Sequence, residues 1–84
     1  MIEDMTVNVL LFASYADALG GPTVQVALPR PATVADLVSR LSSFPGGEGL
    51  SKSARVAINE RFAASNDPIA PGDEIALIPP VAGG

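Results

Sequence analysis

Residues 33–43 constrain the fold most strongly, because they form the one stretch with a clear helical period. Four apolar residues recur at i, i+3, i+4 and i+7, the spacing of one helix face: Val34, Leu37, Val38 and Leu41. Thr33 stands where an N-cap belongs, and Asp36 follows three residues later, a variant of the capping box. We therefore predict a helix over residues 34–43. One amphipathic helix covers only one face of a sheet, so the rest of the chain has to supply that sheet.

Alternating apolar and polar residues predict strands on both sides of this helix. Five segments show the pattern, the fourth least clearly: residues 5–13, 23–28, 55–59, 61–64 and 74–78. Residues 14–19 are expected to form one or two helical turns, since two glycines follow them. Pro29 and Pro31 are expected to end the second strand, because proline cannot donate to a strand ladder.

Turns and loops separate the later segments. Proline and glycine predict a loop over residues 42–53, and turns are predicted at Asp67-Pro68 and at Pro71-Gly72-Asp73. Asp73 and Glu74 could contact a metal, but a turn before a strand explains them better, and no metal site is predicted.

The order of elements predicts an α+β fold of the β-grasp (ubiquitin-like) type. The two opening strands form a hairpin, and the helix then crosses over so that the last strand lies parallel to the first. The result is a mixed sheet of four to five strands packed on one main helix. A ferredoxin-like fold would need a second helix of similar length, and none is visible. Residues 1–78 are predicted to form this domain, and residues 79–84 an extended, flexible C-terminal Gly-Gly tail.

Composition excludes several kinds of chemistry. The 84 residues include no histidine and no cysteine, so the chain has no imidazole base, no thiolate and no cysteine zinc site. The serines therefore lack a histidine to activate them. The glycine-rich segment at residues 45–49 is not a phosphate loop, because no Lys-Ser/Thr pair follows it, and it is interpreted as a flexible connection.

Charge and hydropathy indicate where the protein acts. The formal net charge is −4 and the five basic residues are scattered, which argues against a nucleic-acid partner. The first residues are acidic rather than basic, and no apolar run reaches the ~18 residues of a membrane span. We therefore expect a cytoplasmic protein with neither a nucleic-acid nor a membrane partner.

The end of the chain is its most informative feature. Pro79 and Pro80 should stop strand pairing, and Val81 and Ala82 lead to the terminal glycines. At roughly 3.3 Å per residue, the residues after Ile78 reach about 20 Å. A diglycine end passes through channels too narrow for side chains, and the α-carboxylate at its tip is ionised at neutral pH. If it is adenylated, a sulfur donor can convert it to a thiocarboxylate without any cysteine. The alternative is an ordinary frayed terminus, which the proline spacer behind a β-grasp domain makes less favourable.

Several segments together resemble the MoaD family, the small subunit of molybdopterin synthase and a ubiquitin-like sulfur carrier. The resemblance covers nearly the whole chain and is carried by these segments: Val9-Leu-Leu-Phe-Ala13, Thr33-Val-Ala-Asp-Leu37, Val56-Ala-Ile-Asn59, Asp67-Pro-Ile69, and Pro71-Gly-Asp-Glu-Ile-Ala-Leu-Ile-Pro-Pro-Val-Ala-Gly-Gly84. It implies a protein that is not an enzyme by itself and binds no cofactor. An E1-like enzyme would adenylate its C-terminus with ATP, and a sulfur donor enzyme would supply the sulfur. The large synthase subunit, its partner in a heterotetramer, would then form the dithiolene of molybdopterin from cyclic pyranopterin monophosphate.

The resemblance also assigns individual residues. Gly84 is the position that carries the adenylate and the thiocarboxylate, and the residues that pass into the partner are Gly83, Ala82, Val81, Pro80 and Pro79. Phe12, Phe62 and Ile78 match partner-binding positions, although Phe12 and Ile78 would fit ordinary core packing equally well. Ala16 stands where some relatives carry a basic residue, so any charge contact there is lost.

Two further interpretations stay open. The first is a β-grasp sulfur carrier for thiamine, cysteine or tRNA thiolation. The second is a β-grasp binding module that carries no sulfur. The Phe12-Ala13 pair and the intact Pro79-Pro80-Val81 favour molybdopterin synthesis.

Overall fold

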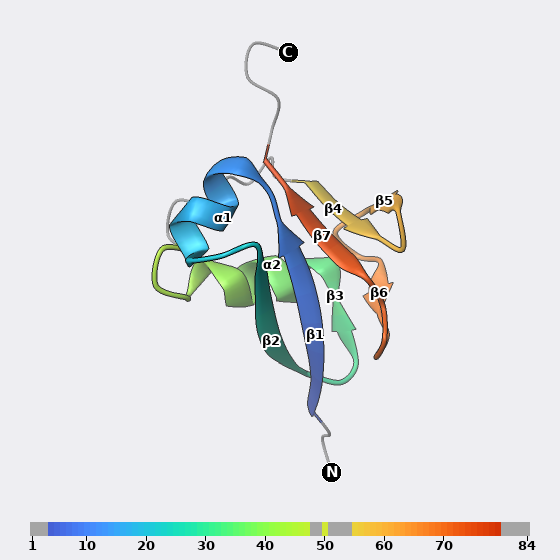
Figure 1. The fold of residues 1–84 in the computed structure, drawn as a ribbon. Helices are drawn as coiled ribbons and strands as arrows, with labels where there is room; N and C mark the ends of the chain where they lie inside the picture. Colours follow the sequence, from blue (N-terminus) through green and yellow to red (C-terminus); the bar gives the residue numbers. More distant parts are fainter. Residues whose placement is uncertain (1–3, 48–49, 51–54, 80–84) are drawn as a thin grey trace.

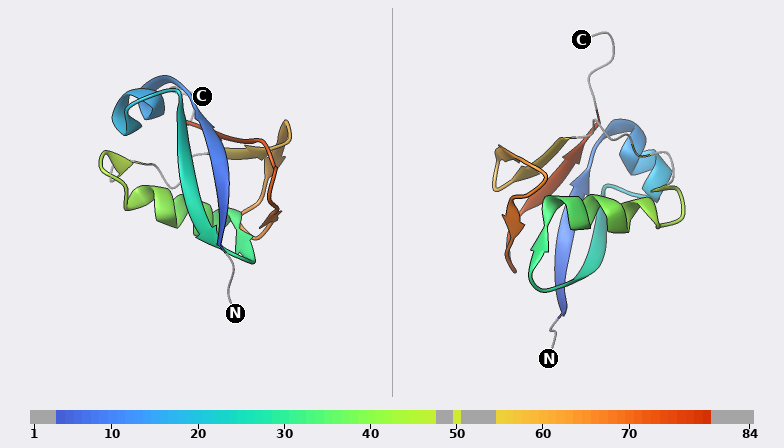
Figure 2. Two further views of the ribbon diagram at one scale, coloured as in Figure 1. Left: turned by 60° about the horizontal axis from the view of Figure 1, so that its bottom comes forward. Right: turned by 180° about the vertical axis from the view of Figure 1, so that it is seen from behind.

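The computed structural model describes residues 4–47, 50 and 55–79, which form a curved sheet with the longer helix across one face (Figure 1). The elements, in chain order, are β1 (Asp4–Leu11), α1 (Ala13–Leu19), β2 (Thr23–Pro29), β3 (Ala32–Thr33), α2 (Val34–Ser42), β4 (Arg55–Ile58), β5 (Arg61–Ala63), β6 (Pro68–Ile69) and β7 (Ile75–Ile78). Viewed from behind, α2 crosses the strands of the main sheet (Figure 2). Within the described part of the chain, no helix is long and apolar enough to cross a membrane.

The main sheet has five strands in the order β2-β1-β7-β4-β5, so the first and last strands are neighbours near its middle. β1 and β7 run parallel, whereas β1–β2, β4–β7 and β4–β5 are antiparallel. The crossover that a parallel pair requires contains α2. This arrangement is the predicted β-grasp fold.

Alternation along the strands separates the core from the outer face of the sheet. The eight residues of β1 alternate strictly between exposed and buried. The residues between the sheet and α2 are almost completely excluded from solvent, as Val9 and Ile75 of the sheet and Leu37 and Leu41 of the helix illustrate. Among the described residues no polar or charged side chain is buried. In the described ranges the side chains of the core are therefore apolar, and the charged side chains lie outside it.

The N-terminus of α2 forms the predicted capping box. The Thr33 hydroxyl accepts a hydrogen bond from the Asp36 backbone N–H at 3.3 Å, and the Asp36 carboxylate accepts one from the Thr33 N–H at 2.9 Å. The N–H groups of Val34 and Ala35 donate to the carbonyls of Asp67 and Ser65. These contacts satisfy the free donors of the first helical turn, so α2 is fixed to the segment after β5.

Several predicted boundaries were wrong by one or two residues, and three of the differences from prediction have a clear physical reason. The first strand ends at Leu11 rather than residue 13, because Phe12 is the N-cap of α1. The second strand includes Pro29, which lies opposite Asp4; β2 is an edge strand, where a missing donor is tolerated. The predicted turn at Asp67-Pro68 instead opens β6, which pairs with β3 in a separate two-stranded sheet. Each of these two strands has only two residues, too few to show a period.

The glycine-rich segment after α2 was predicted to be a flexible connection. At Gly46 and Gly47 it instead packs closely against the two helices. A Cβ atom on Gly46 would lie 1.9 Å from the carbonyl oxygen of Ala18, and one on Gly47 would lie 2.0 Å from that of Leu41. Gly46 also has a φ of +87°, a backbone angle that residues other than glycine rarely adopt. The two glycines therefore let the backbone rest against both helices. The remainder of the predicted loop lies largely outside the described residues.

We predict that Gly47→Ala lowers the free energy of unfolding by about 2 kcal/mol, because the added methyl group overlaps the backbone of α2. Urea unfolding followed by circular dichroism measures this change. The matched control is Gly21→Ala, whose Cβ would meet only the Thr23 carbonyl oxygen at 4.0 Å. Equal stability of the two variants would show that the close approach of Gly47 is not needed.

Candidate functional site: an apolar depression on the outer face of the sheet

The outer face of the sheet, opposite α2, has an apolar half. Six apolar residues there line an open depression of about 280 Å³: Leu10, Phe12, Ala57, Phe62, Ala76 and Ile78. They come from β1, β4, β5, β7 and the residue that follows β1. The other half of the face, formed by β1 and β2, carries exposed polar residues such as Asn8 and Gln25. The apolar side chains are therefore gathered at one side of the face.

Strand register places small residues in the centre of this depression and large ones around it. Ala76 lies between Leu10 of β1 and Ala57 of β4, and Ala57 pairs in turn with Phe62 of β5. Leu10 is 37% exposed, Phe12 48% and Phe62 64%. Exposed apolar groups gathered in a hollow mark a surface that binds another molecule.

The position of Phe12 follows from the way β1 ends. Phe12 keeps an extended backbone, with φ −125° and ψ 149°, and its carbonyl accepts a hydrogen bond from the Tyr15 N–H as α1 begins. The chain turns away at this residue, so its ring is left half-exposed beside β7 instead of entering the core.

The position of Phe62 follows from the tight turn between β4 and β5. Asn59 and Glu60 both have positive φ angles, 52° and 71°, as a two-residue hairpin turn of type I′ requires. The Asn59 side chain donates to the Asp73 carboxylate at 3.1 Å and accepts from the Glu74 N–H at 3.0 Å. Asp73 also accepts from the Ala70 N–H at 2.8 Å. The hairpin is thereby tied to the start of β7, and Asp73 acts in a turn, as predicted.

Two carboxylates, those of Glu60 and Glu74, line the depression. Arg55 does not line it, but its guanidinium carbon lies 5.2 Å from the centroid of the Phe62 ring, within the range of a cation–π contact. No group of three histidine, cysteine, aspartate or glutamate side chains that could hold a metal ion occurs in the described ranges.

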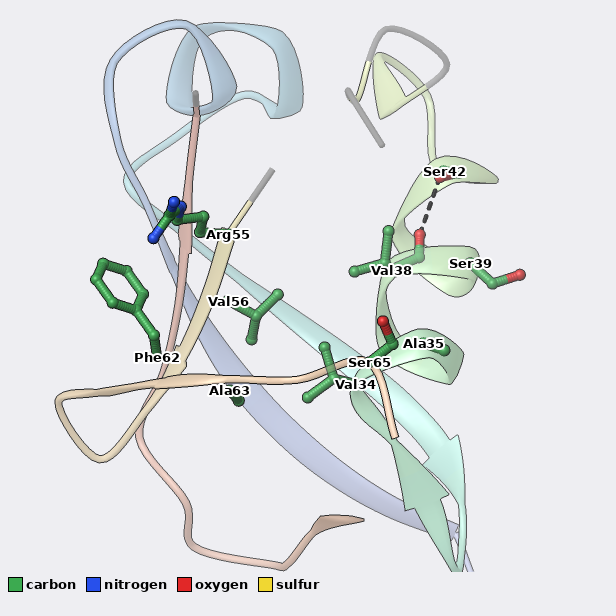
Figure 3. A pocket seen from close by; sticks show the side chains of 10 residues that line it. All are labelled: Val34, Ala35, Val38, Ser39, Ser42, Arg55, Val56, Phe62, Ala63 and Ser65. Atoms are coloured by element: carbon green, nitrogen blue, oxygen red, sulfur yellow. Dashed lines mark hydrogen bonds between the residues drawn. The ribbon is translucent and has the colours of Figure 1, made fainter. Parts of the chain in front are cut away.

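A second hollow, of about 510 Å³, lies between α2 and the β4–β5 hairpin (Figure 3). Its walls are mainly apolar, with Val34 and Val38 on the helix facing Val56 and Ala63 on the hairpin. Phe62 lines both hollows and therefore forms the ridge between them. The sequence analysis did not identify this hollow.

The structure brings the three predicted partner-binding residues together. Phe12, Phe62 and Ile78 line the same depression although they are far apart in the sequence, and none belongs to the buried core. Leu10, Ala57 and Ala76 were missed; their outward positions in alternating strands were the available signal. Pro79 follows β7 and is half-buried. The other predicted tail residues, namely Pro80, Val81, Ala82, Gly83 and Gly84, lie outside the described residues.

Comparison with known proteins gives a consistent picture. The model described as the ThiS family matches residues 9–84. The molybdopterin synthase sulfur carrier subunit of Arabidopsis thaliana is 30% identical over 83 residues, which cover 98% of this chain and 86% of that protein. Small archaeal modifier protein 1 of Haloferax volcanii is 39% identical over 83 residues, covering 88% of this chain and 95% of that protein.

Solved structures agree with the sequence matches. The crystal structure of the Haloferax volcanii modifier superposes with a TM-score of 0.79 at 35% identity and covers 94% of this chain and 99% of that one. A chain from the complex of subunits 1 and 2 of molybdopterin-converting factor from Helicobacter pylori superposes with a TM-score of 0.65 at 25% identity. That match covers 95% of this chain and 100% of the other.

We predict that Phe62→Ala leaves the free energy of unfolding within about 1 kcal/mol of the original value, because the ring is mostly exposed and packs little. By contrast, Leu77→Ala, which empties a fully buried position, should cost about 3 kcal/mol. Thermal and urea unfolding measure both. A large loss of stability in Phe62→Ala would mean that this ring is part of the core packing.

Proposed function

Because this chain belongs to the ThiS family of ubiquitin-like sulfur carriers, we propose that it is the small subunit of a molybdopterin synthase. The observation that carries this proposal is the apolar depression at β7, which joins Phe12, Phe62 and Ile78 on one surface. The likeness to the plant sulfur carrier subunit and to a chain of the Helicobacter pylori complex supports it. The large synthase subunit docks on the depression, and the residues after β7 enter its active site.

The chemistry takes place on the main chain at Gly84. An E1-like enzyme transfers AMP from ATP to the terminal carboxylate and releases pyrophosphate, which turns a poor electrophile into a good one. Sulfide supplied by a sulfur donor enzyme then attacks the acyl-adenylate, AMP leaves, and a thiocarboxylate remains. Its sulfur attacks cyclic pyranopterin monophosphate bound to the large subunit, and water hydrolyses the resulting acyl bond to restore the carboxylate. The catalytic side chains belong to the partners, in agreement with a chain that has no histidine and no cysteine.

The same activated terminus permits other uses. A sulfur carrier for thiamine, cysteine or tRNA thiolation would share the fold and the diglycine end. The likeness to small archaeal modifier protein 1 favours a second candidate function, protein modification. In that case a lysine amine attacks the adenylated carbonyl carbon of Gly84, AMP leaves, and the isopeptide bond that forms keeps the chain attached to its target.

We predict that the chain, incubated with an E1-like enzyme, ATP and a sulfur donor, gains the mass that results from replacing one terminal oxygen by sulfur. Deletion of Gly84 should abolish this gain while the unfolding curve stays unchanged, since no core residue is removed. Intact-mass spectrometry measures the modification. An unmodified mass under these conditions would favour the non-carrier binding module.

Purification from the native cell separates the carrier from the modifier. Trypsin cleaves the bond after Arg61, and no lysine or arginine follows that residue to give a later cleavage site. A modifier would therefore leave residues 62–84 attached to lysines of target proteins. Suppose that such branched peptides are recovered and that the thiocarboxylate form is inactive in dithiolene synthesis. The proposed function would then be protein modification instead of molybdopterin synthesis.

We predict that Phe62→Ala weakens binding to the large synthase subunit about thirtyfold, because truncation of a central exposed aromatic residue commonly removes about 2 kcal/mol of binding free energy. Isothermal titration calorimetry measures the dissociation constant. Gln25→Ala, on the polar half of the same sheet face, is the matched control and should bind like the original chain. Unchanged binding by Phe62→Ala would place the interface elsewhere.

A further inference from the structure

We propose that the partner recognises the direction of β7 from a charge axis that runs along the apolar depression. Glu60 and Glu74, which line the depression, form one end of the axis, and Arg55, which contacts the Phe62 ring at the border of the depression, forms the other. The matching partner surface is an apolar projection with lysine or arginine at the end facing the two glutamates and a carboxylate at the end facing Arg55. This inference rests on the proposed function, because the partner is the large synthase subunit that would receive the residues after β7.

The negative end is built by backbone contacts that hold two glutamates together. Glu74 directly precedes β7, and Glu60 lies in the turn between β4 and β5. The Asn59 N–H donates to the Glu74 carbonyl at 2.7 Å, and the Glu74 N–H donates to the Asn59 side chain at 3.0 Å. Both glutamates are exposed and both line the depression. Arg61 follows Glu60 in the chain but does not line the depression.

The positive end lies where the chain leaves the sheet. Arg55 is the register partner of Ile78, the last residue of β7. Arg55 lines the second hollow and not the depression, but its guanidinium group sits over the ring of Phe62, which lines both. Four residue steps of about 3.3 Å separate Glu74 from Ile78, or roughly 13 Å along the strand. This separation exceeds the Debye length of about 8 Å at physiological salt, so a partner meets the two ends as separate charges.

The charges give the partner a preferred docking orientation, which the apolar centre alone does not provide. Apolar contacts have little directional preference, so the depression alone would accept a partner in more than one rotation. A partner turned end for end would bring like charges together at both ends, which is strongly unfavourable. The charge axis thus selects the one docking direction in which the end of β7 points toward the partner's active site.

The test uses the full chain, the large synthase subunit and a variant that reverses the axis at constant net charge, Arg55→Glu with Glu74→Arg. Calorimetry at 50 mM and 500 mM NaCl gives the dissociation constants. We expect the reversed variant to bind at least tenfold more weakly than the original chain at low salt, with the difference shrinking at high salt. The neutral variant Arg55→Gln with Glu74→Gln should fall between them. Asp4→Arg with Arg30→Glu, a swap of charges that do not line the depression, is the matched control and should bind normally.

The outcomes separate this inference from the proposed function. If the original chain binds and the reversed variant binds equally well at both salt concentrations, the charge axis is overturned while the proposed function stands. If the original chain does not bind the large subunit at all, both are overturned. If the neutral variant loses as much affinity as the reversed variant, the charge axis is also overturned, because loss of the Arg55–Phe62 contact would then explain both losses. Circular dichroism checks that each variant is folded.

Discussion

The parallel pairing of β1 with β7 is the constraint on which the rest of the structure depends. Val9 lies beside Ile75 and Leu11 beside Leu77, and each of these side chains points into the core beneath α2. The same register places Leu10 and Ala76 on the opposite face, where both line the depression. A shift of one residue would exchange the two faces, so one set of hydrogen bonds fixes both the core and the candidate site.

The main elements of the fold were predictable because each has its own local signal. The helical spacing of Val34, Leu37 and Leu41, with the Thr33 cap, identified α2 to within a residue of its end. Alternation identified the five strands of the main sheet, and the single helix limited the possible topologies. The β3–β6 pair could not be predicted, because it joins Ala32 to Ile69 and depends on contacts between distant segments. The close packing of Gly46 and Gly47 was hidden for the same reason: the groups they approach, in Ala18 and Leu41, belong to other elements.

The candidate site was predictable in part. Phe12, Phe62 and Ile78 were identified through resemblance to a family, whereas their common location depends on the strand order. Glu60 was not identified, and Glu74 was considered only as part of a turn or a metal contact, because nothing in the local sequence distinguishes a rim carboxylate from any other exposed one. Glu60 enters the site only because the Asn59–Glu60 turn is tied to the start of β7. The second hollow exists because α2 and the β4–β5 hairpin lie apart from each other. No local sequence pattern predicts that separation.

The position of β7 at the inside of the sheet has a consequence for biosynthesis. Val9 and its neighbour Ile75 are 75 − 9 = 66 residues apart in the chain. The sheet therefore cannot close during translation until β7 has left the ribosome, and the long loop that must be closed slows this step. Because the last strand completes the core, a nascent chain that stops before β7 exposes the apolar faces of β1 and β4 to chaperones and proteases. Folding thus acts as a check on synthesis through β7: a chain that has acquired its native sheet has been translated at least as far as Ile78.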